Sequence, residues 1–233
     1  MKSQINSLID DTFAKEYFFN MDNSLLEALR SGKPVTIVFL GDSTTEQNHY
    51  TAGEPGHVAL IANKLLPIFG GTLTILNQGV SGDTSGDMLD RIETSVLRLN
   101  PDFIVISSGI NDSLEQQHVE NFQRNMEEMI RVISERTSAR IILRTTSPVL
   151  GDNRIIRDEL NPVLTSLAKT HGLGFIDTFR MIDSGEYDYP ELMMDAYHPN
   201  GKGQEVIANT ILYGLFFAYQ ESVDFNKNTK NEI

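Results

Sequence analysis

The stretch Val35-Thr36-Ile37-Val38-Phe39-Leu40-Gly41-Asp42-Ser43 decides how this chain folds. Its first six residues are apolar or β-branched without interruption, which is typical of a strand buried on both faces of a parallel sheet. Gly41 allows the backbone angles of a sharp turn, and Asp42 can accept hydrogen bonds within that turn. Ser43 then projects from the carboxyl edge of the sheet, where open α/β sheets bind their ligands. Taken alone, Gly-Asp-Ser also fits an ordinary strand-ending turn, which is the more frequent occurrence.

Four further short apolar runs follow the first, and stretches with apolar residues at helical spacing separate them. The runs span 72–76, 103–107, 140–143 and 174–176, and the helical stretches span 57–69, 86–99, 118–136, 153–171 and 203–220. Strands that alternate with helices favour right-handed crossovers and a sheet covered on both faces. The pattern therefore predicts an α/β fold, a three-layer α/β/α sandwich around a central parallel sheet of about five strands.

The chain has 233 residues, a length that suits one large α/β domain. Residues 1–33 are expected to form an N-terminal helical extension packed on the domain. Gly32 is typical of the end of a helix, and Pro34 is typical of the position before a strand. Residues 34–220 form the predicted domain, and residues 221–233 form a polar tail that we expect to be frayed. We find no linker, internal repeat or low-complexity tract in the sequence.

Charge and composition exclude several classes of protein. The formal net charge is −13, which argues against nucleic acid as a partner because a phosphate backbone calls for a positive surface. The sequence contains no cysteine, so disulfides, thiolate zinc sites and a cysteine nucleophile are excluded.

The sequence also bears on location. Residues 1–11 have no apolar core of signal-peptide length, and the apolar run at 211–219 is far shorter than the ~20 residues that span a bilayer. We therefore expect a cytoplasmic protein without stable membrane insertion. The run at 211–219 fits a core helix, and its use as the interface of a homo-oligomer stays open.

Two loops after the second and third predicted strands carry hydrogen-bond donors. Residues 79–84 read Gly-Val-Ser-Gly-Asp-Thr, and a glycine N–H aimed into a pocket is half of an oxyanion hole. Asp83 or Thr84 also fits the N-cap of the next helix. Asn111 follows the third strand and offers a side-chain NH₂ of the kind that stabilises oxyanions, although Asn and Asp also commonly begin a helix or turn there.

Asp195 and His198 lie three residues apart, directly before the last helical stretch. This spacing lets a carboxylate oxygen contact one imidazole nitrogen and leaves the other nitrogen for Ser43. Asn200 is expected to cap the final helix and so to fix this loop. The remaining histidines lack such neighbours and are interpreted as structural: His49, His57, His118 and His171.

The order of these segments along the chain resembles the GDSL, or SGNH, hydrolase family of esterases and lipases. Gly-Asp-Ser ending at Ser43 matches the family's first block, residues 79–84 resemble the second, Gly-Ile-Asn-Asp at 109–112 matches the third, and Asp-Ala-Tyr-His at 195–198 matches the last. The resemblance covers roughly residues 35–215. It departs from the family name at Thr44, where the name has leucine.

The resemblance implies a flavodoxin-like SGNH fold and a role for each matched residue. Ser43 is the expected nucleophile, and His198 and Asp195 complete a Ser-His-Asp triad. The expected oxyanion hole consists of the Ser43 N–H, the Gly82 N–H and the Asn111 side chain. Such a site performs serine acyl transfer on an ester and requires no metal or organic cofactor.

Other chemistries remain in competition with this interpretation. Asp42, Asp195 and His198 could ligate a divalent ion, but the sequence has no His-Glu-x-x-His helix and no second paired histidine. The glycine motifs of phosphate-binding NTPases and dinucleotide enzymes are also missing. An acyltransferase and a non-catalytic binding protein on the same fold are further alternatives.

The substrate is the least determined part of the prediction. Family members act on acetylated sugars, short esters, lysophospholipids and acyl thioesters, so we expect a small-molecule ester, with acetyl on a carbohydrate or other small alcohol favoured. A lysophospholipase or thioesterase is the alternative. Residues 145–150 end the fourth strand and are expected to border the pocket. A second set lines the pocket or simply packs a long loop: Tyr187, Tyr189, Met193, Met194 and Tyr197.

Overall fold

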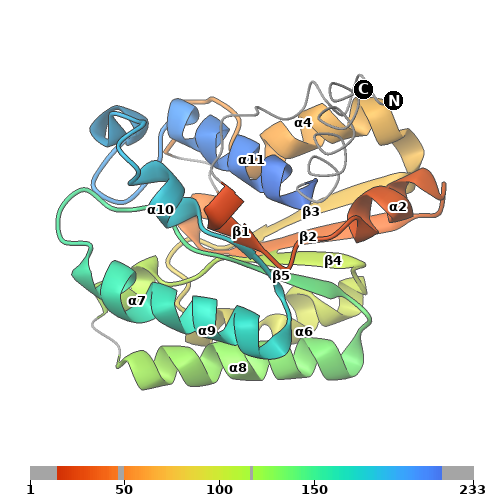
Figure 1. Ribbon diagram of the computed structural model, residues 1–233, viewed down its shortest axis with the longest axis horizontal. Coiled ribbons are helices and arrows are strands. Elements are labelled where there is room, and N and C mark those ends of the chain that lie inside the picture. Colours follow the sequence, from red (N-terminus) through yellow and green to blue (C-terminus); the bar gives the residue numbers. More distant parts are fainter. Residues whose placement is uncertain (1–14, 47–49, 116–117, 217–233) are drawn as a thin grey trace, which may run out of the picture.

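The computed structural model describes residues 15–46, 50–115 and 118–216. Its centre is a six-stranded sheet in the order β1-β6-β5-β4-β2-β3 (Figure 1). Strands β2 to β6 pair in parallel, and β1 pairs antiparallel with β6. The strands are β1 (Phe18–Phe19), β2 (Val35–Gly41), β3 (Leu73–Gly79), β4 (Phe103–Ile106), β5 (Arg140–Arg144) and β6 (Gly174–Ile176). The predicted α/β class and its five parallel strands are confirmed, and β1 is an addition.

Helices and helical turns connect the strands. The α-helices are α2 (Ser24–Arg30), α3 (Ser43–Glu46), α4 (His57–Phe69), α5 (Ser85–Asp90), α6 (Ile92–Ser95), α7 (Ile110–Leu114), α8 (Val119–Arg136), α9 (Asn161–His171), α10 (Thr178–Ile182) and α11 (Gly201–Leu215). The 3₁₀ turns are η1 (Lys15–Tyr17), η2 (Gly70–Thr72), η3 (Leu97–Leu99) and η5 (Tyr189–Leu192), and η4 (Ile156–Leu160) is a π-helical turn before α9. Among the helices of these ranges, none is long and apolar enough to cross a membrane.

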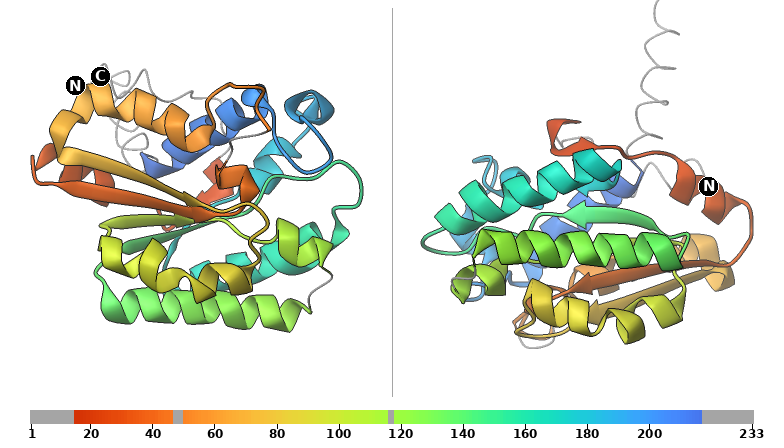
Figure 2. Two further views of the ribbon diagram at one scale, coloured as in Figure 1. Left: turned by 180° about the vertical axis from the view of Figure 1, so that it is seen from behind. Right: turned by 90° about the horizontal axis from the view of Figure 1, so that it is seen from below.

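Side chains of the strands alternate between two apolar layers, because successive strand residues point to opposite faces. Ile37 and Phe39 of β2 pack with α2, α4 and α11 on one face, whereas Val38 and Leu40 pack with α5, α8 and α9 on the other. Figure 1 and the left view of Figure 2 show helices above and below the sheet, with α4 and α11 on one side and α8 and α9 on the other. Burial on both faces explains why β2 reads as a continuous apolar run rather than an alternating one.

The prediction of one helix over residues 86–99 is wrong. The backbone leaves helical geometry at Arg91 and again at Val96, which divides the stretch into α5, α6 and η3. Met88, Ile92 and Val96 are nevertheless all buried on the same face. The helical spacing of these apolar residues therefore survives in the short pieces and made them look like one helix.

The segment before β2 is only partly the helical extension that the sequence predicts. Within its described part, α2 buries three leucines against the core, and Phe18 and Phe19 pair with Ile176 and Phe175 as strand β1. Phe19 also stacks on Phe175 with ring centroids 4.5 Å apart. Residues 1–14 and the predicted tail 221–233 lie outside the described residues.

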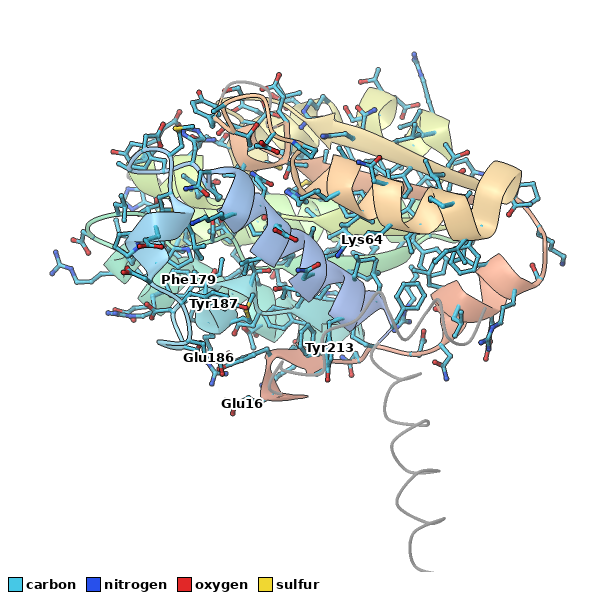
Figure 3. The ribbon with its side chains drawn as sticks, turned by 90° about the horizontal axis from the view of Figure 1, so that it is seen from above. Glu16, Lys64, Phe179, Glu186, Tyr187 and Tyr213 are labelled. Carbon is cyan, nitrogen blue, oxygen red and sulfur yellow. The ribbon has the colours of Figure 1, made fainter. Side chains whose placement is uncertain are left out.

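Helix α11 closes the structure beside α4. Figure 3 looks down on these two helices and labels Lys64, whose Nζ donates to Asn209 Oδ1 on α11 at 2.6 Å. Nearly all of α11 from Ile207 onwards is buried, including Ile211 and Leu215. The described part of the apolar run at 211–219 is therefore a core helix.

The order in which successive strands are added to the sheet reverses at β2, and this reversal positions the functional loops. The chain leaves β2 through α4 on one face to reach β3, then passes through α5 and α6 on the opposite face to reach β4 on the other side of β2. Loops that follow β2 and β4 therefore separate at the carboxyl edge of the sheet. Such a topological switch point is where open α/β sheets form a binding crevice.

Candidate active site

Ser43 is the first residue of α3, and only Asp42 separates it from the end of β2. Two glycines let this short helix lie against the sheet. A Cβ on Gly41 would overlap Thr45, and a Cβ on Gly79 would overlap the backbone of Thr45 and Glu46. Gly41 itself has no positive φ, so the expectation that it supplies unusual backbone angles is wrong. It is required because α3 comes too close for any side chain.

The three predicted acid, base and nucleophile side chains meet in one chain of hydrogen bonds. Ser43 Oγ lies 2.9 Å from His198 Nε2, and His198 Nδ1 lies 2.9 Å from both Oδ1 and Oδ2 of Asp195. A carboxylate only accepts hydrogen bonds, so Nδ1 carries the proton in this arrangement. The lone pair of Nε2 then faces the Ser43 hydroxyl, which is the geometry that a general base needs.

Asp195 is held as a carboxylate by the turn in which it lies. Its Oδ1 accepts the backbone N–H groups of Tyr197 and His198, each at 2.8 Å. Burial works to raise the pKa of Asp195, but these backbone bonds and the His198 side chain outweigh it and hold the pKa below its ordinary value. A carboxylate that stays ionised keeps the imidazole in the useful tautomer and stabilises its protonated form.

Asn200 fixes the loop that carries the acid and the base. It is the N-cap of α11, as predicted, and its Oδ1 accepts the Gly203 N–H at 3.1 Å. Its Nδ2 donates to the carbonyl oxygens of Glu191 at 2.8 Å and Met193 at 3.2 Å. One side chain thus connects both ends of the loop to a helix in the core.

The two loops with candidate oxyanion donors also contact each other. Gly82 adopts φ 86°, a left-handed conformation that favours glycine. Asn111 is the second residue of α7, and its Nδ2 donates one hydrogen to the carbonyl of Asp83 at 2.8 Å. That bond orients the amide and leaves its second hydrogen for another acceptor. Thr84 is the N-cap of α5: its side chain accepts the Asp87 N–H, and the Asp87 carboxylate accepts the Thr84 N–H. The capping interpretation of this loop is therefore also confirmed.

Comparison with known proteins places this arrangement in a family. A model of the GDSL-like lipase/acylhydrolase family matches residues 39–206. The chain belongs to this family. It is a carboxylic ester hydrolase related to acetylxylan esterases.

Two curated relatives and one solved structure illustrate the relationship of this GDSL-family hydrolase. An acetylxylan esterase from Geobacillus stearothermophilus is 24% identical over 219 residues, covering 83% of this chain and 100% of that protein. An arylesterase from Vibrio mimicus is 25% identical over 181 residues, covering 77% of this chain and 87% of that protein. The crystal structure of an acetylxylan esterase from Geobacillus stearothermophilus has a TM-score of 0.68 at 22% identity, covering 79% of this chain and 95% of that chain. Variants of that enzyme with alanine in place of one serine, one histidine or one aspartate are described as catalytic mutants.

Arg91 holds together the backbone around the hydrolase site, and sequence reasoning missed it. Its Nε donates to Asp83 Oδ2 at 2.5 Å, and one terminal nitrogen donates to the carbonyls of Gly41 at 3.1 Å and Gln78 at 3.0 Å. The guanidinium therefore joins the ends of β2 and β3 to the loop of Gly82. The available signal was a cation between the buried positions of an apolar helical pattern.

Asp112 connects the two oxyanion loops in the same way. It is buried, and it accepts the Ser85 N–H at 3.1 Å, the Ser85 hydroxyl at 2.5 Å and the Ser108 hydroxyl at 3.2 Å. Burial raises the pKa of Asp112 above its ordinary value, and the bonds from Ser85 and Ser108 work against that rise. The carboxyl fixes α7, and with it Asn111, to the start of α5.

His57 is structural, as predicted, and the structure shows how. Its Nδ1 lies 2.7 Å from Gln204 Oε1, which also accepts the His57 backbone N–H at 2.9 Å. Gln204 Nε2 in turn donates to the carbonyl of Thr44 at 3.1 Å. Burial, and then the positive charge of Arg144, lower the pKa of His57 to about 3, against the opposing bond to Gln204. A neutral imidazole thus helps to join α4, α11 and α3.

Asp42 and Arg144 are two charged residues buried at this edge of the sheet, each 1% exposed, and their opposite charges interact. Burial raises the pKa of Asp42, while two hydrogen bonds from Thr44 and the charge of Arg144 oppose the rise. Burial lowers the pKa of Arg144 to about 10, and Asp42 opposes that fall. Arg144 therefore remains a cation at neutral pH.

The alternative metal site is not formed by the residues that suggested it. Asp42 Oδ1 accepts the Thr44 N–H at 2.9 Å and its hydroxyl at 2.7 Å, while Asp195 and His198 bond directly to each other. In the described ranges, no group of three or more histidine or acidic side chains is arranged to hold a metal ion.

Tyr50 covers His198, a contact that the sequence did not indicate. The two rings are nearly parallel, at 2°, with centroids 3.4 Å apart. The stack covers one face of the imidazole and restricts its rotation. No local pattern signals it, because the two residues lie far apart in the chain and meet only in the folded protein.

The predicted pocket-lining residues divide into two groups. Tyr187 and Tyr189 are partly buried and pack against the apolar core, so ordinary packing explains them. Met194 and Tyr197 are exposed beside the triad. In the segment 145–150, Val149 and Leu150 line a pocket, whereas Thr145 points inward and donates to Asp177 at 3.0 Å.

Proposed function

We propose that this hydrolase cleaves short-acyl esters, chiefly acetyl esters, of a carbohydrate or another small alcohol through an acyl-enzyme on Ser43. The observation that carries the proposal is the continuous hydrogen-bond chain from Ser43 Oγ through His198 to Asp195. The relatives that are named acetylxylan esterases support the acetyl and carbohydrate parts of the proposal.

In the first half of the reaction, His198 Nε2 takes the proton of Ser43 Oγ as that oxygen attacks the ester carbonyl carbon. Asp195 stabilises the imidazolium that forms. The tetrahedral oxyanion accepts hydrogen bonds from the Ser43 N–H, the Gly82 N–H and the free hydrogen of Asn111 Nδ2. The carbon–oxygen bond to the alcohol then breaks, and the imidazolium gives its proton to the leaving oxygen.

In the second half, a water molecule replaces the alcohol. His198 Nε2 takes a proton from the water as its oxygen attacks the acyl carbon on Ser43. The same donors hold the second oxyanion, and the acid is released when His198 returns the proton to Ser43 Oγ. Spacing supports this assignment, because the aspartate and histidine of the catalytic mutants in the Geobacillus enzyme also lie three positions apart.

The test is hydrolysis of p-nitrophenyl esters from acetate to palmitate, followed by acetylated sugars. We expect kcat/KM to fall with acyl length in the wild type. Ser43→Ala and His198→Ala should each lower kcat by on the order of a millionfold, judged from another serine hydrolase. Ser134→Ala, an exposed serine on α8, is the matched control and should leave kcat unchanged.

Other outcomes would redirect the proposal. A rate that rises with acyl length would indicate a lipase or thioesterase. Near-wild-type turnover by Ser43→Ala would remove Ser43 from the mechanism. If no ester is cleaved, labelling by a serine-reactive phosphonate would separate a narrow substrate range from a binding protein, because only an activated serine reacts.

A further inference from the structure

Large apolar side chains that are exposed gather around the candidate active site. In the described part of the chain, six such side chains are exposed: Leu66, Val80, Leu114, Leu150, Met194 and Tyr197. All but Leu66 lie on segments that carry candidate catalytic or oxyanion residues, or that hydrogen-bond to the backbone of those segments. Grouped exposed apolar residues mark binding sites, whereas scattered ones need no explanation.

Three of these residues line one pocket of about 280 Å³, which we call the Tyr197 pocket. Leu114 and Ser113 form one wall, and Leu114 shares a face of α7 with Asn111 because the two are three residues apart. Leu150 and Tyr197 form another, and the ring of Tyr197 meets that of His198 edge to face, with centroids 6.5 Å apart. The pocket thus lies between the elements that hold the oxyanion donor and the base.

The walls of the Tyr197 pocket are fixed by hydrogen bonds. Asn153 accepts the Val149 N–H and donates to the Val149 carbonyl, both at 2.7 Å. The Leu150 N–H donates to the carbonyl of Ala196 at 2.7 Å, which joins this segment to the loop of His198. A pocket built in this way is preformed, as small-molecule sites usually are.

The lining of the pocket combines apolar surface with two polar groups. Ser113 Oγ donates to the carbonyl of Ile110 at 2.7 Å, so its lone pairs are free to accept a hydrogen bond. Asp152 is exposed and supplies a carboxylate that is paired with Arg154. A sugar ring offers C–H faces to the apolar walls and hydroxyl groups to these acceptors, whereas an acyl chain would desolvate Ser113 and Asp152 without replacing their bonds to water.

The reaction also requires the alcohol to bind on the side of the site where the Tyr197 pocket lies. The leaving oxygen must receive its proton from His198 Nε2, so the alcohol lies next to His198, and Tyr197 is the neighbouring wall. On the basis of the proposed function, we propose that the Tyr197 pocket binds one sugar ring on the alcohol side of the scissile ester. The acyl group then remains near Ser43 and Asn111.

The experiment compares two acetyl esters that differ only in their alcohol: a mono-acetylated methyl xylopyranoside and ethyl acetate. We measure kcat/KM for both in the wild type, Tyr197→Leu, Leu114→Ala and the control Leu66→Ala. The ratio of the sugar ester to ethyl acetate should fall tenfold or more in Tyr197→Leu and Leu114→Ala, as roughly expected for lost pocket contacts. Leu66→Ala changes an exposed leucine on α4 and should leave the ratio as in the wild type.

Two results would overturn the assignment. A ratio that stays constant in both pocket variants, whatever happens to the absolute rates, would show that these side chains only support the loops. If the wild type cleaves ethyl acetate but has no higher kcat/KM for the sugar ester, the sugar pocket is refuted, while the proposed esterase function stands. A wild type inactive on both esters and on p-nitrophenyl acetate would instead refute the proposed function.

Discussion

Replacing His57 by asparagine should remove part of the acid sensitivity of this protein's stability. His57 is buried with its Nδ1 donating to Gln204, and its pKa is lowered to about 3. In the unfolded chain an ordinary histidine titrates near pH ~6.5. Between these pKa values His57 is neutral in the folded state but protonated in the unfolded state. The contribution of His57 to the free energy of unfolding is therefore fully present above pH ~6.5 and is lost as the pH falls towards 3.

The size of the effect follows from this difference in pKa. Between these two pKa values, each pH unit removes about 1.4 kcal/mol of the free energy of unfolding. From pH 7 to pH 5 the loss from His57 is about 2 kcal/mol, a sizeable part of the ~5–15 kcal/mol that stabilises a typical domain. Asparagine keeps an N–H donor for Gln204 but has no group that titrates in this range.

The assay is urea unfolding at pH 7, 6 and 5, followed by circular dichroism. The stability advantage of the wild type over His57→Asn should shrink by about 2 kcal/mol between pH 7 and pH 5. His171→Asn, at the exposed end of α9, is the control and should show no such change. Parallel curves for the wild type and His57→Asn would refute the reasoning, whatever their vertical offset.

Three further substitutions test the site itself. Asn111→Ala removes an oxyanion donor and should lower kcat by about 100- to 1,000-fold with little change in KM for p-nitrophenyl acetate. Arg91→Met leaves Asp83 without its cation and should lower the free energy of unfolding by about 3 kcal/mol in urea titrations, while an unchanged midpoint would show that the Arg91 bonds contribute nothing. Tyr50→Leu removes the stack on His198 and should lower kcat about two- to tenfold, whereas Tyr50→Phe keeps the stack and should lose less.

The strand framework could be predicted from the sequence because its signals are local. Each parallel strand contains a short apolar run, and in β2, β4, β5 and β6 burial on both faces of the sheet produces that pattern, whereas β3 lies at the sheet edge and is only partly buried. Strand β1 could not be predicted, because Phe18-Phe19 is two residues long and becomes a strand only by pairing with β6. The broken stretch at 86–99 was missed because its apolar residues keep helical spacing through the breaks.

The candidate triad could be proposed because Ser43 ends a strand and Asp195 and His198 share one turn. The supporting residues could not, because their partners are distant in the chain. Gln204 lies 147 positions from His57, and the stack of Tyr50 on His198 depends on two loops that meet only after folding. The spacing of residues in the sequence does not indicate such contacts, and they can be identified only in the folded structure.

The distance along the chain between nucleophile and base has a consequence for biosynthesis. Ser43 and His198 are 155 positions apart, and Gln204 on α11 fastens the carbonyl of Thr44 beside the nucleophile. A nascent chain emerges from its N-terminus, so β2 and α3 are made long before the base exists. The site is therefore incomplete until α11 has docked beside α3, and recovered esterase activity in a refolding experiment requires this docking in addition to the sheet.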